Sequence, residues 1–165
     1  MSGVDGEEVR RVPTPAEWAG GLPAFERLFA EFYGRVPNDP VLAPVFAGMS
    51  ADHVRHVSRF VTEVMGGPGE YTAEGGSHAA MVSRHLGRNL TQEQRRRWVT
   101  LLLECADELG VPDDPEFRST LVAYLEWGTR IAVLNSGPGG APPPADAPMP
   151  RWGWGEVGGP YLPPE

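Results

Sequence analysis

The first strong pattern in the chain is a helical spacing of apolar residues over positions 23–36. The residues that define it are Phe25, Leu28, Phe29, Phe32, Tyr33 and Val36. Their 3.6-residue period predicts an amphipathic helix. A short turn is predicted next, because Asp39 can cap a helix and Pro40 suits a first helical position. A further helix is predicted from Ser50 to the break at Gly66–Gly67–Pro68.

The second half of the chain carries two longer helical patterns. Thr91 and Gln94 have the spacing of a capping box, which predicts a helix that extends to about residue 109. Asp114 predicts the start of a last helix, which extends to about residue 134. No segment alternates apolar and polar residues as a half-buried strand would. The sequence therefore predicts an all-α protein.

Glycine and proline divide the chain into a domain and a tail. The 165 residues suit a single domain. Residues 137–165 contain 16 of the 39 glycines and prolines, so we expect an irregular tail there. The predicted division is an N-terminal extension over 1–15, a helical domain over 16–136, and this Pro/Gly-rich C-terminal extension.

The tail also contains aromatic residues, which leave two interpretations open. Trp152, Trp154 and Tyr161 lie within it. A Pro-rich extension of this kind is often disordered. Alternatively, the aromatic side chains fold back onto the domain or dock a partner.

Charge and cysteine content exclude several classes of function. The formal net charge is −8, which argues against nucleic acid as the main partner. All 14 cationic residues are arginine, so lysine chemistry is excluded. Cys105 is the only cysteine, which excludes an intrachain disulfide, a cysteine-cluster metal site and thioether attachment of haem through paired cysteines. It fits a reducing compartment, and we expect it to be a buried, inert thiol.

The location of the protein is also constrained by sequence. No run of 18 apolar residues is present, so we expect no membrane span. The N-terminus is polar and acidic, unlike a secretory signal. We therefore expect the protein in the cytoplasm. The sequence leaves its oligomeric state open.

Four histidines are the candidates for metal chemistry: His53, His56, His78 and His85. His53 and His56 share a helix face, but no third ligand lies nearby, so a zinc or two-metal site is disfavoured. His85 precedes a helix cap, where a histidine often faces solvent. Neutral imidazole is, however, a common axial ligand of haem iron. Aromatic residues such as Tyr33 could line a haem slot, although helical spacing alone predicts that they pack in the core.

Several stretches, in order, resemble the truncated haemoglobins, and specifically their second group. They are WAGG (18–21), AFERLFAEFYGRVPNDPVLAPVF (24–46), HVSRFVTEVMGGPGEY (56–71), SRHLGRNLTQEQRRRW (83–98) and YLEWGTRIAVLNS (124–136). Two features are specific to the resemblance. One is the motif GGP-x-x-Y, and the other is Trp98, placed 13 residues after His85.

The resemblance implies a two-over-two helical sandwich that binds haem b. His85 is then the iron ligand, and Arg84 pairs with a haem propionate. Tyr33 and Trp98 are then the distal groups that donate hydrogen bonds to the bound ligand. The pocket-lining residues are then Phe46, Val57 and Phe60. The weakly patterned stretch over 66–84 corresponds to the extended loop that replaces most of one helix in this family.

The sequence departs from the family pattern at several positions. His53 stands where the second group usually has a small residue. It could hydrogen-bond the ligand, gate entry, bind iron as a sixth ligand, or swing outward. His56 stands where a cationic residue often approaches a propionate, so we expect a polar contact there. Gly87 replaces a frequent proline, and the tail lies outside the resemblance.

The function implied by the resemblance is reversible binding of dioxygen, nitric oxide and related diatomic gases, as in oxygen transport. Oxidoreductase activity is a further expectation, either nitric oxide dioxygenation or peroxidase-like turnover. It would need an external reductase, because no flavin or nicotinamide motif is present. The alternatives are a haem-based gas or redox sensor without turnover, and an interaction module that has lost haem. The run Arg95–Arg96–Arg97 is either a solvated helix face or a docking site for an electron donor.

Overall fold

The computed structural model describes residues 11–155, and these residues form an all-helical structure. The elements are α1 (Pro15–Ala19), α2 (Leu22–Arg35), the 3-10 helix η1 (Val36–Asn38), α3 (Ala43–Phe46), α4 (His53–Val64), α5 (Glu70–Ala73), α6 (His78–Ser83), α7 (Gln92–Glu108) and α8 (Pro115–Ser136). No strand occurs within this part of the chain. The predicted all-α class is confirmed.

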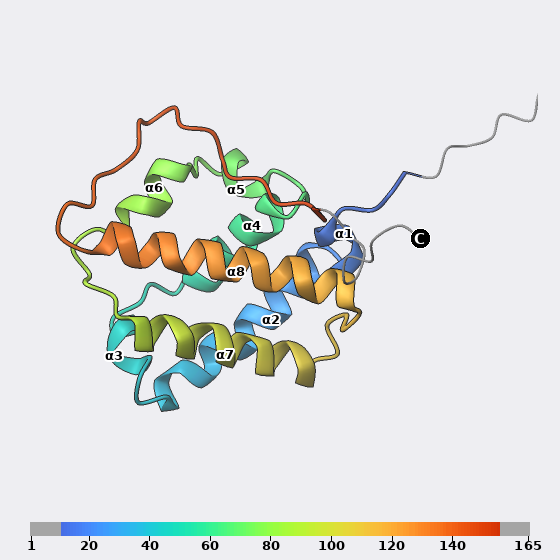
Figure 1. Cartoon of the computed structure of the whole chain (residues 1–165), viewed down its shortest axis with the longest axis horizontal. Coiled ribbons are helices and arrows are strands. Elements are labelled where there is room, and N and C mark those ends of the chain that lie inside the picture. Colours follow the sequence, from blue (N-terminus) through green and yellow to red (C-terminus); the bar gives the residue numbers. More distant parts are fainter. Residues whose placement is uncertain (1–10, 156–165) are drawn as a thin grey trace, which may run out of the picture.

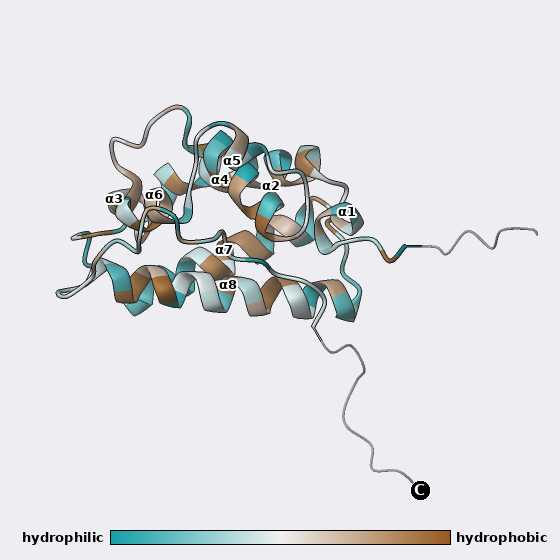
Figure 2. Ribbon diagram, turned by 90° about the horizontal axis from the view of Figure 1, so that it is seen from above, coloured by the Kyte–Doolittle hydropathy of each residue, from teal (hydrophilic) through white to brown (hydrophobic). Residues whose placement is uncertain are grey.

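The four long helices form two layers. Helix α2 packs against α4, and α7 packs against α8, while α2 also contacts α7 across the layers. Figure 1 shows α7 and α8 running side by side along the molecule. Figure 2 shows from above that α7 and α8 lie on one side of α2 and α4. This is the two-over-two sandwich expected of a truncated globin.

The apolar faces of the long helices build the core between the layers. The fully buried side chains from α2 include Phe29 and Phe32, and those from α8 include Phe117 and Leu121. Burying a side chain of this size stabilises the fold by roughly 1.5–3 kcal/mol. The apolar residues that define the helical period in the sequence therefore lie on the face of each helix that packs against the other layer.

The predicted start of α7 is confirmed, whereas α4 starts later than predicted. Thr91 and Gln94 form the capping box at the start of α7. Helix α4 begins at His53 and not at Ser50. The Ser50 hydroxyl instead accepts a hydrogen bond from the backbone N–H of Asp52 at 3.2 Å, which forms a turn before the helix.

The weakly patterned stretch contains a tight turn and two short helices, α5 and α6. Gly66 has a φ of 91°, and a Cβ there would lie 2.7 Å from a side-chain carbon of Thr14. A Cβ on Gly67 would lie 2.8 Å from the backbone oxygen of Thr62. The glycine pair is therefore required, because the chain turns against α1 and α4 at this point.

Two of the three arginines in the basic run of α7 form ion pairs with other parts of the chain. The Arg95 side chain is only 3% exposed and pairs with Glu126 of α8 at 3.1 Å. Arg97 pairs with Asp39 at 2.6 Å. A solvated helix face is therefore wrong for Arg95, whereas the Arg97 side chain is 35% exposed and Arg96 is exposed. The docking site for an electron donor stays a prediction.

Three other expectations concern burial, membranes and the chain termini. Cys105 is buried, as predicted. No helix within residues 11–155 has the length and apolarity needed to cross a bilayer. Residues 137–155 form neither helix nor strand, and Trp152 and Trp154 fold back onto the core. Tyr161 lies outside the described residues.

Candidate functional site

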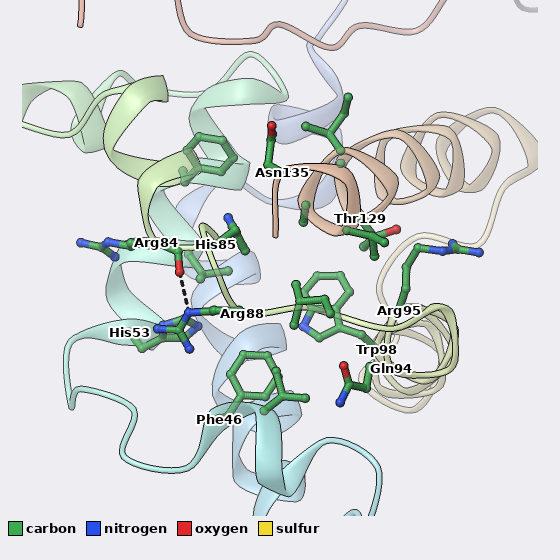
Figure 3. A pocket seen from close by; sticks show the side chains of 18 of the residues that line it. Phe46, His53, Arg84, His85, Arg88, Gln94, Arg95, Trp98, Thr129 and Asn135 are labelled. Atoms are coloured by element: carbon green, nitrogen blue, oxygen red, sulfur yellow. Dashed lines mark hydrogen bonds between the residues drawn. The ribbon is translucent and has the colours of Figure 1, made fainter. Parts of the chain in front are cut away.

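A cavity of about 490 Å³ lies between the two layers and has mostly apolar walls. It is lined by all nine of the predicted site residues: Tyr33, Phe46, His53, His56, Val57, Phe60, Arg84, His85 and Trp98. Figure 3 shows that five of them, Phe46, His53, Arg84, His85 and Trp98, surround it from different elements. Tertiary folding therefore gathers into one cavity residues that lie up to 65 positions apart in sequence.

His85 is placed in the cavity by the turn that follows α6. Its Nδ1 lies 2.9 Å from the backbone oxygen of Met81, so Nδ1–H donates to that carbonyl. Burial lowers the pKa of His85, which keeps the ring neutral. A neutral imidazole that donates from Nδ1 has its lone pair on Nε2, the arrangement found in metal-binding histidines. His85 is thus suited to coordinate a metal through Nε2.

The tyrosine of the GGP-x-x-Y motif supports this side of the cavity. The Tyr71 hydroxyl donates to the backbone oxygen of Ser77 at 3.1 Å. The Ser77 side chain in turn caps α6 by accepting from the backbone N–H of Ala80. The motif therefore fixes the start of the short helix that leads to His85.

Tyr33 and His53 form a hydrogen-bonded pair on the opposite side of the cavity. Their hydroxyl oxygen and Nε2 lie 3.0 Å apart. Burial raises the pKa of Tyr33 well above its usual range, and the Trp98 indole partly opposes this. Burial, reinforced by the positive charge of Arg84, lowers the pKa of His53 to about 4. Both groups are therefore neutral at neutral pH, and His53 points inward.

Aromatic rings hold the hydroxyl of Tyr33 in place. Phe46 packs edge-on against Tyr33 with ring centroids 5.3 Å apart, and it also contacts His53. Trp98, from α7, packs against Phe32 at 5.2 Å. Edge-to-face contacts of this kind fix ring orientation as well as excluding water.

Two arginines at the mouth of the cavity carry charges that no acidic residue balances within residues 11–155. A guanidinium nitrogen of Arg84 lies 3.4 Å from Nδ1 of His56, and the expected contact of His56 with a propionate stays a prediction. Arg88 donates to the backbone oxygen of Arg84 at 2.5 Å, as Figure 3 shows. Sequence reasoning missed Arg88, although its spacing of four from Arg84 could have indicated it. By contrast, ion pairs hold most other arginines in the described chain, including Arg95 and Arg97.

Gln94, Thr129 and Asn135 also line the cavity and were missed by sequence reasoning. Nothing in the local sequence marks them, because α7 and α8 bring them there only by packing. His78 lines the cavity too, and its Nδ1 is buried without a hydrogen-bond partner in the described structure.

The chemistry of these residues fits an iron porphyrin. That group needs apolar walls, one axial nitrogen and cations for two propionates, and the cavity offers Nε2 of His85 with Arg84 and Arg88. A metal ion held by protein ligands alone would need several of them together. Within residues 11–155, no three side chains of His, Cys, Asp or Glu form such a group.

Comparison with known proteins agrees with this geometry. The family model described as "Bacterial-like globin" matches residues 16–127. A group 2 truncated hemoglobin of Bacillus subtilis (strain 168) is 32% identical over 113 residues, covering 68% of this chain and 83% of that protein. A group 1 truncated hemoglobin of Nostoc commune is 39% identical over 74 residues, which cover 44% of this chain and 58% of that protein.

Solved structures show the same likeness. The group II truncated hemoglobin from Bacillus anthracis has a TM-score of 0.67 and 29% identity, covering 75% of this chain and 93% of that one. The truncated oxygen-avid haemoglobin from Bacillus subtilis has a TM-score of 0.64 and 31% identity, covering 73% of this chain and 99% of that one. The chain belongs to the bacterial-like globins and, within them, to the group II truncated haemoglobins.

Proposed function

We propose that the cavity binds haem b, which Nε2 of His85 would hold by coordinating the iron. Arg84 and Arg88 pair with the propionates at the mouth, and His56 contributes a polar contact beside Arg84. Phe46, Val57 and Phe60 provide apolar contacts with the ring. The observation that carries this proposal is the hydrogen bond between His85 and Met81, because it assigns the proton to Nδ1 and frees Nε2.

Bound haem supplies an iron centre that reversibly binds a diatomic gas and transfers electron density to it. Tyr33 and Trp98 then act as hydrogen-bond donors to the partial negative charge on that gas. Each such bond to a charged acceptor contributes about 1–3 kcal/mol. Two donors favour slow release of the gas.

The tautomer of His53 decides whether Tyr33 can donate. When Nε2 of His53 carries the proton, it donates to the phenolic oxygen, and the Tyr33 proton is free for the gas. When Nδ1 carries the proton, Tyr33 donates to His53 instead. His53 is therefore a switchable partner of the distal tyrosine in this proposal.

Slow release of the bound gas suits a redox reaction at the iron better than it suits rapid delivery of the gas. The proposed reactions are nitric oxide dioxygenation and peroxidase-like turnover, with electrons from an external reductase. A sensor without turnover is the second candidate. It is favoured by the packing of the tail on Tyr124 and Trp127, both of which line the cavity.

The proposal is tested by titrating the purified chain with haem and recording the Soret band. We expect saturation at one haem per chain in the wild type and loss of stoichiometric binding in His85→Ala. His78→Ala is the matched control, because His78 begins the short helix that precedes His85 and lines the same cavity. Full retention of the wild-type spectrum by His85→Ala would contradict the axial assignment.

A second experiment distinguishes the oxidoreductase from the sensor. The reduced, oxygenated protein is mixed with nitric oxide, and the formation of ferric protein and nitrate is followed. Rapid stoichiometric conversion supports the oxidoreductase. Absence of conversion, with a change in tail protection on gas binding, supports the sensor.

A further inference from the structure

The segment that follows α8 returns across the molecule and forms hydrogen bonds with α4, with α8 and with the residues that precede α1. Figure 1 shows it arching from the end of α8 past α6 and α5 toward α1. The backbone N–H of Trp152 donates to the Val64 oxygen of α4 at 2.8 Å. The Thr120 hydroxyl of α8 donates to the Gly153 oxygen at 2.5 Å. Trp154 Nε1 donates to the Pro13 oxygen at 2.8 Å.

The bond to Val64 satisfies a group that α4 cannot satisfy itself. Val64 is the last residue of α4, and the carbonyls of a final helical turn lack intrahelical partners. Trp152 supplies one of the missing donors from a segment almost ninety residues further along the chain. The tail thereby completes the end of the helix that carries His53 and Phe60.

The aromatic contacts of the tail reach the cavity itself. The Trp152 ring packs on Tyr124 at 5.8 Å and on Trp127 at 5.6 Å between centroids. Tyr124, Trp127 and Pro150 of the tail all line the cavity. Tyr124 is only 5% exposed. Without Trp152, the outer faces of the Tyr124 and Trp127 rings would lose this cover.

We infer that residues 149–154 form a wall of the haem cavity between α4 and α8, with Trp152 as the positioning residue that holds Tyr124 and Trp127 against it. The wall leaves the mouth at Arg84 and Arg88 as the entrance and keeps water from the apolar side. This inference rests on the proposed haem function. The wall lies beyond the residues that the family model matches, which end at residue 127.

The test compares haem retention and gas escape in full-length variants loaded with haem. Trp152→Ala removes the aromatic cover, Trp152→Phe restores most of it, and Val122→Ala is the control. Val122 lies on α8, is 37% exposed and does not line the cavity. The readouts are haem transfer to excess apomyoglobin, the fraction of carbon monoxide that escapes after flash photolysis, and hydrogen exchange in the last turn of α4.

We expect Trp152→Ala to accelerate haem loss roughly tenfold, because the Tyr124 and Trp127 rings lose their aromatic contacts with half-buried Trp152. We also expect it to raise the escaping fraction of carbon monoxide. Faster exchange in the last turn of α4 should accompany both effects. Trp152→Phe should return all three readouts toward the wild type, and Val122→Ala should leave haem loss and gas escape unchanged.

Two outcomes overturn the inference, and they are distinguishable. If wild type and Trp152→Ala both bind haem with equal loss rates and equal gas escape, the wall is rejected while the haem function stands. If the wild type binds no haem at all, the proposed function fails and the wall fails with it. A deletion of residues 137–165 gives a second comparison, and Trp152→Ala decides the question if the deletion does not fold.

Discussion

At His85, one backbone carbonyl decides which ring nitrogen is available for coordination. Met81 lies four residues earlier, and its oxygen accepts the Nδ1 proton. Burial lowers the pKa of the ring, so the imidazole stays neutral and its lone pair stays free. The same reasoning applies to the Tyr33–His53 pair, where burial keeps both partners neutral and hydrogen-bonded.

Removing either distal donor should weaken retention of dioxygen. We expect Tyr33→Phe and Trp98→Phe each to raise the dioxygen dissociation rate roughly tenfold, the effect of losing one hydrogen bond to a partly charged acceptor. Stopped-flow displacement by carbon monoxide measures the rate. Trp18→Phe serves as the control, because Trp18 does not line the cavity. Unchanged rates in both distal variants would remove these side chains from the role.

Acidification should destabilise the haem-free protein in part through His53. The pKa of His53 is about 4 in the folded chain, against an ordinary value of 6.5. As the pH falls through this window, the unfolded chain binds a proton that the folded chain does not, so the free energy of unfolding falls. The lowered pKa of His85 acts in the same direction.

His53→Gln should therefore lose less stability than the wild type between pH 7 and pH 5. Urea unfolding of both haem-free proteins at the two pH values measures the difference. An equal loss in the variant would show that His53 is not a source of the acid sensitivity.

At the scale of elements, short helices depend on contacts that reach outside them. Helix α6 has only six residues, too few to be stable alone. The Ser77 cap and the Tyr71 hydroxyl hold its start, and buried Val82 anchors its end. Helix α7 is different, because its capping box and long apolar face are both local to its own sequence.

The capping box of α7 should contribute measurable stability. We expect Thr91→Ala to lower the free energy of unfolding by about 1 kcal/mol, because the backbone N–H of Gln94 loses its acceptor. Thr91→Ser keeps the hydroxyl and should lose only a few tenths of that amount. Urea unfolding of the three proteins measures both effects, and equal losses in Ala and Ser would contradict the capping explanation.

At the scale of the whole molecule, the two layers enclose a cavity beside their hydrophobic core. Residues of α2, α4, α7 and α8 all contribute to its walls, and the tail adds Pro150. A ligand that fills such a cavity binds the folded chain and not the unfolded one, so binding and folding are coupled. The haem site is therefore expected to govern global stability.

Haem should raise the unfolding temperature of the wild type. At a free haem concentration about a thousandfold above the dissociation constant, the added stability is about 4 kcal/mol. Differential scanning calorimetry with and without haem measures the shift. His85→Ala should lose most of the shift, and an equal shift in both proteins would point to non-specific haem binding.

Local signals were enough for the long helices, and the family resemblance was enough to name residues that line the cavity. The apolar period around Phe29 and the Thr91–Gln94 box gave close estimates of α2 and α7. Thr129 and Asn135 were missed, because only the packing of α8 brings them to the cavity. The burial of Arg95 was missed as well, since it depends on Glu126, 31 residues away.

By itself, the sequence determined the helical class, the long helices and, through a resemblance, the family and the residues around the cavity. These follow from periodicity, capping and motif spacing, which are properties of short stretches. Only the tertiary structure decided the burial of His85, the inward direction of His53 and the return of the tail onto Val64 and Tyr124. Each of these depends on which groups meet in the folded chain, because burial and hydrogen-bond partners exist only after the elements have packed.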